Sequence, residues 1–188
     1  MTTRGEETRA NIATAALELL RAKGSAGLTM RGVAAATGLS LSNVQYHFKN
    51  RAALLDGLTT HHLQRCSDAL EHALRDAGRV SLRSILVASL CDERVLATGP
   101  AFRELFALAR SEPKVHAQLT TYYATSLERL TEFLGTISDA TRSTRIEVAT
   151  VLMTSIEGAY LLADATPVSA KALAKRLEAV AIRMLAPD

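Results

Sequence analysis

The stretch from Leu28 to Arg51, LTMRGVAAATGLSLSNVQYHFKNR, constrains the fold more than any other part of the chain. Thr29 precedes a short alanine-rich run and carries the hydroxyl group of a helix N-cap, and Leu28 and Val33 are spaced to pack across that cap. Gly38 stands where such a helix needs a C-terminal residue in the left-handed conformation. We therefore expect a short helix between Thr29 and Gly38.

A second short helix is expected directly after this glycine. Ser40 has the character of another N-cap, and Leu39 and Val44 repeat the hydrophobic staple. The helix would run from Leu41 to about His47. Two helices joined by a tight, glycine-containing turn form a helix-turn-helix.

The outer face of this second helix is polar and carries no acidic residue. At about 100° per residue, Leu41 and Phe48 lie within about 60° of Val44, whereas Gln45 and Lys49 point away. Ser, Asn and Gln side chains can pair with base edges, Lys, Tyr and His can reach phosphates, and a helix fits the major groove. An alanine-rich helix pair is also ordinary in all-α proteins that do not bind DNA, so both interpretations stay open on this pattern alone.

The segment GLSLSNVQYHFKNRAALL, which follows one expected helix and precedes a long one, resembles the TetR family of dimeric, ligand-responsive repressors. The resemblance is specific from Arg9 to Leu58 and concerns only the arrangement of helices beyond that. The family usually has Tyr where this chain has Gln45, so the resemblance implies that Tyr46 contacts phosphate and that Gln45 reads a base. The family's usual Lys early in the next helix is Arg51 here, which keeps the charge.

The predicted DNA-binding residues come from the start of the first short helix, from the second short helix and from the residues directly after it. They are Thr29, Arg31, Ser40, Ser42, Asn43, Gln45, Tyr46, His47, Lys49 and Arg51. The expected partner is a palindromic operator in double-stranded DNA. We assign residues 1–49 to a DNA-binding domain and residues 50–188 to a helical domain for ligand binding and dimerisation.

Length and composition favour an all-α protein. With 188 residues, the chain can form one substantial core or two small coupled domains. Alanine and leucine are abundant, tryptophan is absent and β-branched runs are short, which favours helix. Residues 1–65 carry eight basic and four acidic residues, against fourteen and fifteen in the remainder. The positive excess lies with the helix-turn-helix, as phosphate binding requires, although an excess of this size also arises by chance.

The sequence gives no sign of secretion or membrane insertion. Cys66 and Cys91 are too few for a disulfide framework, and the beginning of the chain lacks an apolar signal region. No apolar run approaches the roughly 18 residues of a membrane span. We expect a cytoplasmic, reduced protein with no membrane partner.

Breaks at glycine and proline divide the rest of the chain into further expected helices. They are residues 4–23 before the helix-turn-helix, a long helix capped by Asn50 and ending before Gly78, residues 81–97, residues 101–110, a helix after Pro113 to Gly135, residues 145–164 and residues 169–185. The first three helices of the chain would share a small core in which Phe48 is the largest member.

A small-molecule site is predicted among the later helices. Phe102, Phe106, Tyr122 and Tyr123 are four of the eight aromatic residues in the chain, and aromatic residues either line a ligand cavity or pack a core. Two further candidate ligand residues are Met153 and Glu157, and Glu157 is alternatively exposed at the rim of an interface. The predicted ligand is an unknown small-molecule inducer.

The last two expected helices predict a dimer. Residues 145–164 are apolar nearly all round, which in a globular protein indicates burial on more than one side. Residues 169–185 can cover part of this surface, and a second copy of both helices would complete a four-helix interface. Gly158 costs roughly 1 kcal/mol in a helix relative to Ala, so the close approach of a ligand or helix would explain it.

Catalysis and metal binding are not predicted. His62 and Cys66 have the i, i+4 spacing of a metal pair, with His61 adjacent, but the sequence shows no third ligand. We find no G-x-S-x-G, H-E-x-x-H, glycine-rich phosphate loop or Glu-x-x-His pair, so we expect neither an enzyme nor a cofactor. The predicted function is a sequence-specific transcriptional regulator, a repressor released by a ligand. The alternative is a dimeric helical small-molecule-binding or interaction module without DNA binding.

Overall fold

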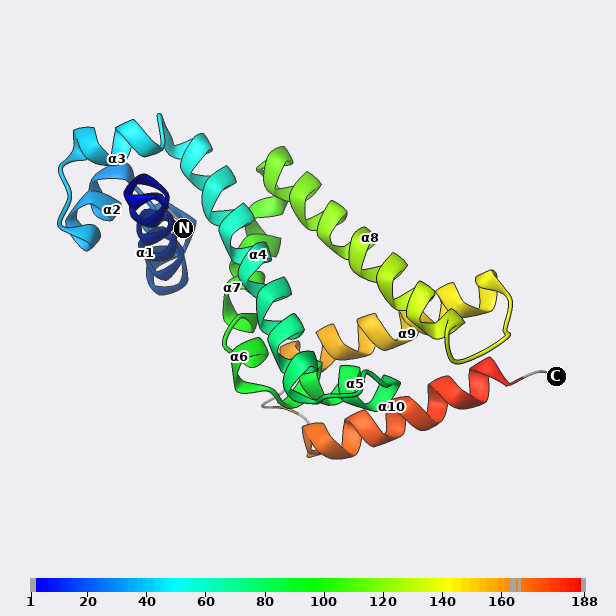
Figure 1. Ribbon diagram of the computed structural model, residues 1–188. Coiled ribbons are helices and arrows are strands. Elements are labelled where there is room, and N and C mark those ends of the chain that lie inside the picture. The colour runs from blue at the N-terminus through cyan, green and yellow to red at the C-terminus, as the bar shows by residue number, and fades with distance from the viewer. Residues whose placement is uncertain (1–2, 163–164, 166, 187–188) are drawn as a thin grey trace. The chain divides into compact units, whose positions relative to one another are not determined.

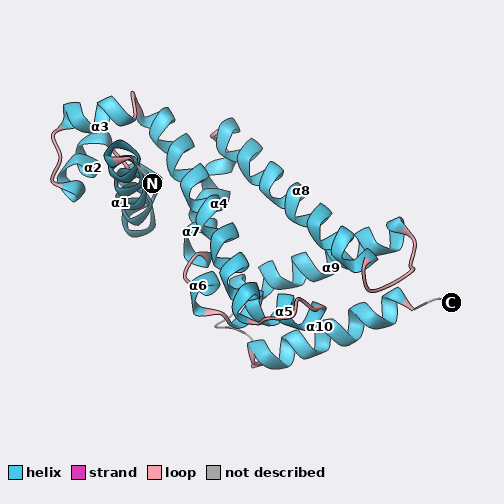
Figure 2. Cartoon of the chain, in the orientation of Figure 1, coloured by secondary structure: helices cyan, strands magenta, loops and turns pink. Residues whose placement is uncertain are grey.

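The computed structural model describes residues 3–162, 165 and 167–186, and every regular element in these ranges is a helix (Figures 1 and 2). The all-α prediction is therefore confirmed. In chain order the helices are α1 (Arg4–Gly27), α2 (Met30–Thr37), α3 (Leu41–His47), α4 (Arg51–Asp76), α5 (Leu82–Cys91), α6 (Glu93–Leu96), α7 (Gly99–Ala109), α8 (Pro113–Gly135), α9 (Arg142–Leu161) and α10 (Ala170–Leu185).

The predicted caps of the helix-turn-helix are present. The Thr29 hydroxyl accepts a hydrogen bond from the backbone N–H of Gly32 at 3.0 Å, and the Ser40 hydroxyl accepts one from Asn43 at 3.1 Å. Gly38 ends α2 with φ of 68°, in the left-handed region that side chains disfavour. Local sequence alone therefore sets where α2 and α3 begin and where α2 ends.

The predicted single helix over residues 81–97 is wrong. It divides into α5 and α6 because Asp92 takes an extended conformation and caps α6. The Asp92 carboxylate accepts from the backbone N–H of Arg94 at 2.9 Å and from its guanidinium at 2.7 and 3.0 Å. An Asp side chain that finds local donors of this kind competes with the continuous helix.

Helix α9 begins three residues before the predicted Arg145. Thr141 is its N-cap, and the Thr141 hydroxyl accepts from the backbone N–H of Thr144 at 3.2 Å. The predicted end at Asp164 lies outside the described residues. Helix α1 carries a kink after its predicted end, at Gly24, where φ is 63°.

The chain forms two compact units. Unit 1 comprises Met1–Ser67 and Thr98–Thr120, and unit 2 comprises Asp68–Ala97 and Thr121–Asp188. Helices α4 and α8 each pass from one unit into the other. The predicted division at residues 49 and 50 separates the helix-turn-helix from the later helices, and it stays a prediction.

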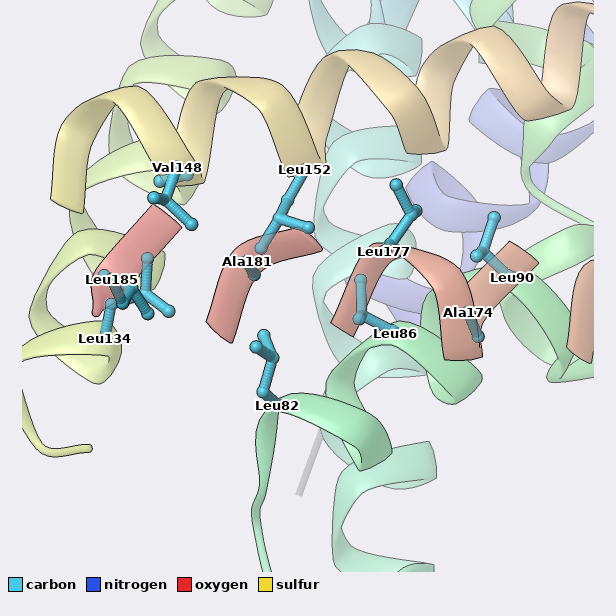
Figure 3. Packing of buried hydrophobic residues seen from close by; sticks show 11 residues of the cluster. Leu82, Leu86, Leu90, Leu134, Val148, Leu152, Ala174, Leu177, Ala181 and Leu185 are labelled. Atoms are coloured by element: carbon cyan, nitrogen blue, oxygen red, sulfur yellow. The ribbon is translucent and has the colours of Figure 1, made fainter. Parts of the chain in front are cut away.

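Each unit has its own apolar core. In unit 1 the largest fully buried side chains include Ile12 and Leu20 of α1, Phe48 after α3, and Leu54 of α4. In unit 2, α5, α9 and α10 pack with the end of α8, and Figure 3 shows their leucines and alanines meeting. Among the described residues, none of the helices combines the length and apolar character that a membrane span requires.

Candidate nucleic-acid interface

The position of α3 is set by a buried phenylalanine at its end. Phe48 is 1% exposed, and its backbone N–H donates to the Val44 carbonyl at 2.9 Å to complete the helix. Helix α4 approaches the Phe48 ring so closely that a Cβ atom at Gly57 would lie 2.2 Å from its Cε1 atom. The sequence prediction that Phe48 is a core residue of this region is confirmed.

Arg9 of α1 also holds α3, and sequence reasoning did not assign it this role. Its guanidinium carbon lies 4.1 Å from the centroid of the Phe48 ring, and the same group donates a hydrogen bond to the carbonyl of His47. The first contact is a cation–π interaction, and the second satisfies a carbonyl at the C-terminus of α3. The contact spans 38 positions of sequence, and no local pattern points to it.

With Val44 turned inward, the polar side chains of α3 face outward. Ser42, Asn43, Gln45 and Tyr46 are all exposed, and Tyr46 has 86% of its surface accessible. The Tyr46 ring meets the partly buried ring of His47 edge-on, with 5.1 Å between centroids. The helix therefore presents donors, acceptors and one aromatic hydroxyl to solvent, as base and phosphate contacts require.

The candidates at the helix N-termini are exposed as well. Thr29, Arg31 and Ser40 lie at the surface. The hydroxyl oxygens of Thr29 and Ser40 accept the capping hydrogen bonds, and the hydroxyls of Ser40 and Ser42 lie 2.9 Å apart. As a hydroxyl group both donates and accepts, a capping Ser or Thr can still donate to a phosphate oxygen.

Lys49 and Arg51 are only two residues apart but differ in environment. Lys49 is exposed and forms no ion pair within the described part of the chain. Arg51 is half-buried, pairs with Glu112 at 3.0 Å, and also donates to Ser25 and Leu28. Of the predicted DNA-binding residues, all are exposed apart from His47, which is partly buried, and Arg51, whose side chain is engaged inside unit 1.

The stretch of sequence that contains the helix-turn-helix carries a positive charge. No acidic residue occurs between Glu18 and Asp56, and the basic residues of that interval are Arg21, Lys23, Arg31, Lys49 and Arg51. A surface with one sign of charge concentrates phosphates and speeds association with DNA.

Residues 12–58 match the family model for bacterial regulatory proteins of the tetR family. The chain is also 33% identical over 183 residues to an HTH-type transcriptional regulator in the dhlA 5′ region of Xanthobacter autotrophicus. The aligned region covers 90% of this chain and 86% of that relative. The chain belongs to the TetR family. It is a DNA-binding transcriptional regulator, and the resemblance seen in its sequence is confirmed.

Solved structures share the fold of this TetR-family protein. A TetR-family regulator from Cytophaga hutchinsonii has a TM-score of 0.77 at 14% identity, with all of both chains covered. A regulator from Saccharomonospora viridis, crystallised in complex with choline, has a TM-score of 0.73 at 18% identity, with 92% of this chain and 94% of that chain covered. At these identities the similarity concerns the fold alone.

The six residues predicted to bind a ligand fall into both units. Phe102 and Phe106 belong to unit 1, where the Phe102 ring meets the His62 ring edge-on at 5.0 Å. The others, Tyr122, Tyr123, Met153 and Glu157, belong to unit 2. None of the six lines either of two cavities that lie within single units, one of about 390 Å³ beside Arg21 and Arg103 and one of about 680 Å³ beside Thr141 and Met184.

In unit 2, Glu157 has a perturbed carboxyl group. Burial raises its pKa, and the neighbouring Tyr123 hydroxyl opposes that rise. The Tyr122 and Tyr123 rings meet edge-on with 5.4 Å between centroids. Glu157 is partly buried, and its carboxyl group faces the Tyr123 hydroxyl. This environment fits a buried polar group better than it fits a residue exposed at the rim of an interface.

Two neighbouring histidines of α4, His61 and His62, contact other side chains of unit 1. His62 is buried, with its Nε2 atom 3.6 Å from the Sγ atom of Cys66, and the Nε2 atom of His61 lies 3.1 Å from the Thr14 hydroxyl. No group of three potential metal ligands gathers in the described residues. Burial, and to a lesser degree the charge of Arg65, lowers the pKa of His62 to about 4.

Proposed function

We propose that the protein is a homodimeric repressor that binds a palindromic operator in the cytoplasm and is released from it by a small molecule. The observation that carries the proposal is the exposed polar face of α3, which is fixed from behind by buried Val44 and Phe48. A rigid helix with exposed hydrogen-bonding side chains is what reading of the major groove requires.

Within this site the side chains take different roles. Gln45, Asn43 and Ser42 on α3 contact base edges, while Tyr46 and Lys49 contact phosphates. The sugar-phosphate backbone of the DNA is contacted by residues before α3 and at its two ends, namely Thr29, Arg31, Ser40 and His47. The predicted phosphate contact of Arg51 is not included, because its guanidinium is engaged within unit 1.

The dimer would form through α9 and α10. Val151, Ser155, Gly158 and Leu162 follow one another at the spacing of a single helical stripe, and Val151 and Leu162 are exposed apolar residues. A Cβ atom at Gly158 would meet no atom within 4 Å, so the centre of this stripe is open. On α10, Val180 and Ile182 are exposed as well. These surfaces support the predicted four-helix interface with a second copy.

The inducer would bind in unit 2, at Tyr122, Tyr123, Met153 and Glu157. A partly buried carboxyl beside aromatic rings favours an organic cation, since the carboxylate supplies charge and the ring faces attract cations. The choline complex of the Saccharomonospora viridis regulator supports this class of ligand. Roles in ligand binding for Phe102 and Phe106 stay predictions.

The experiment that tests DNA binding is a titration of the purified protein against DNA from immediately upstream of its own coding region. The titration is made at two salt concentrations with random DNA as competitor. We expect tight binding that resists the competitor and weakens steeply with salt. Binding no tighter than to random DNA, followed by failure to enrich any duplex from random oligonucleotides, would favour an interaction module without operator recognition.

A further inference from the structure

Arg51, the first residue of α4, binds three residues in two separate parts of unit 1. Its Nη2 atom donates to the Ser25 hydroxyl at 2.8 Å and to the Ser25 carbonyl at 3.3 Å. Its Nε atom donates to the Leu28 carbonyl at 3.3 Å, and its Nη1 atom donates to Glu112 at 3.0 Å. All three nitrogens of the guanidinium are therefore engaged, and we call this group of contacts the Arg51 clasp.

Two of these partners, Ser25 and Leu28, mark the ends of the last turn of α1, which leads into α2. The turn follows the kink at Gly24 and closes with a hydrogen bond from the Leu28 N–H to the Ser25 carbonyl at 3.3 Å. The next residue, Thr29, is the N-cap of α2. The clasp thus fixes the turn immediately before the helix-turn-helix, and the placement of α2 and α3 depends on that turn.

The third partner lies at the start of a different helix. Glu112 directly precedes Pro113, where α8 begins, and α8 continues beyond Thr120 into unit 2. The two side chains are 39% and 32% exposed, so solvent screens the attraction between their charges. The specificity of the contact then comes from the planar guanidinium, whose nitrogens point to several acceptors at once.

We propose that Arg51 is a positioning residue for the helix-turn-helix rather than a phosphate contact, and that Glu112 couples this positioning to the start of α8. The inference rests on the DNA binding of the proposed function. Loss of the clasp leaves the charge of the DNA-facing surface in place but lowers the fraction of molecules whose α2 and α3 are correctly placed. The apparent affinity for DNA decreases in proportion to that fraction.

Arg51→Lys separates the two roles of Arg51. A lysine keeps the positive charge that a phosphate contact needs, but it lacks the fork that reaches Ser25, Leu28 and Glu112 together. Affinity is measured on a duplex that the wild-type protein selects from random oligonucleotides, over a range of salt concentrations. We expect about tenfold weaker binding with an unchanged salt slope, whereas Lys49→Ala lowers that slope by about one.

Glu112→Gln tests the coupling through the sign of its effect. Removal of a negative charge from a DNA-binding protein ordinarily tightens binding, because repulsion of the phosphates decreases. The clasp predicts the opposite, binding about threefold weaker than wild type, since a neutral amide holds Arg51 less strongly. Glu104→Gln is the matched control, as it removes a negative charge from α7 in the same unit and is expected to bind no more weakly than wild type.

Hydrogen exchange provides the second measurement for the same variants. The clasp predicts faster exchange of amides in residues 25–33 for Arg51→Lys and Glu112→Gln, with α10 unchanged. Two results together would overturn the positioning role: Arg51→Lys binds DNA as tightly as wild type, and Arg51→Ala lowers the salt slope by about one. Glu112→Gln binding as tightly as wild type or tighter would overturn the coupling. If the wild-type protein selects no duplex, the proposed function fails, whereas unchanged exchange in both variants overturns the clasp independently of DNA.

Discussion

Single side chains on α3 differ in what they can recognise. The amide of Gln45 can both donate and accept, which suits the edge of one particular base, whereas the ammonium of Lys49 is a point charge that any phosphate satisfies. Both residues are exposed and neither pairs with an acidic residue in the described ranges. Substitution of one should therefore change sequence preference, and substitution of the other should change affinity in general.

We predict that Gln45→Ala loses about 1 to 3 kcal/mol of discrimination at one base pair of each half-site. Lys49→Ala should weaken binding to all sequences alike and flatten the salt dependence. Competition of operator against single-base variants, measured by fluorescence anisotropy, checks both. Equal losses on operator and random DNA for Gln45→Ala would contradict its assignment as a base reader.

His62 predicts how the stability of the protein depends on pH. Its ordinary pKa of 6.5 is lowered to about 4 in the folded chain, by burial first and then by the charges of Arg65, His61 and Arg21. Between these values the unfolded chain binds a proton at His62 that the folded chain does not. Stability is therefore fully present above pH 6.5 and decreases as the pH falls toward 4.

We expect this decrease to reach about 3 kcal/mol, the free-energy equivalent of the pKa shift. Denaturant unfolding of wild type and His62→Leu measures this loss of stability, over about pH 7 to 4, the range in which the pKa of His62 is shifted. The variant should lose most of this slope, while His72→Leu, at an exposed position of the same helix, should keep it. An identical slope in wild type and His62→Leu would show that other groups cause the acid sensitivity.

The beginning and end of a helix could be predicted from the sequence where the contacts that set them lie within one helical turn. Thr29, Ser40 and Gly38 act on residues within one turn, and so the bounds of α2 and α3 were evident in the sequence. The break at Asp92 also uses local hydrogen bonds, but the flanking residues fit a continuous amphipathic helix equally well. Arg9 acts over a long separation, and a basic residue in α1 looks the same in sequence whether it faces solvent or another helix.

The contact between α4 and the end of α3 gives a prediction about Gly57. Alanine normally stabilises a helix relative to glycine by about 1 kcal/mol, but here the added Cβ atom would lie 2.2 Å from the Phe48 ring. We expect Gly57→Ala to destabilise the protein by about 1 to 3 kcal/mol and to weaken DNA binding, since either Phe48 or α4 must move. Thermal unfolding and operator titration measure the two effects.

Gly5→Ala is the matched control for that variant. Gly5 also lies in a helix, and the nearest atom to an added Cβ is the Thr3 hydroxyl at 3.9 Å, an ordinary contact distance. This substitution should leave DNA binding unchanged and should not lower stability. Gly57→Ala with wild-type stability and affinity would mean that the Phe48 ring has room to shift, and that α4 does not hold α3 through it.

For the whole molecule, sequence pattern identified the apolar surfaces but not what covers them. The apolar character of residues 145–164 predicted burial on more than one side, and α9 indeed packs Val148, Ala149 and Leu152 into the core of unit 2. The same helix leaves Val151 exposed on another side. Hydrophobicity along a chain does not distinguish a surface covered by its own domain from one covered by a second copy, because burial of apolar area is not directional.

The dimer is tested by placing a charge on the exposed stripe of α9. We predict that Val151→Glu converts the protein from dimer to monomer, since two carboxylates would be buried near the two-fold axis without partners. Thr150→Glu adds the same charge one residue earlier and about 100° round the helix, away from the stripe, and should remain dimeric. Sedimentation of both variants over a range of concentrations measures the association.

Operator binding then shows whether dimerisation matters for function. A monomer contacts one half-site, so Val151→Glu should lose at least about 2 kcal/mol on a full palindrome relative to wild type, because the second half-site no longer binds at high effective concentration. On an isolated half-site, wild type and Val151→Glu should bind alike, since the variant leaves unit 1 unchanged. A Val151→Glu protein that remains dimeric and binds the palindrome normally would place the interface on a different surface, of which the exposed Ile182 side of α10 is the next to test.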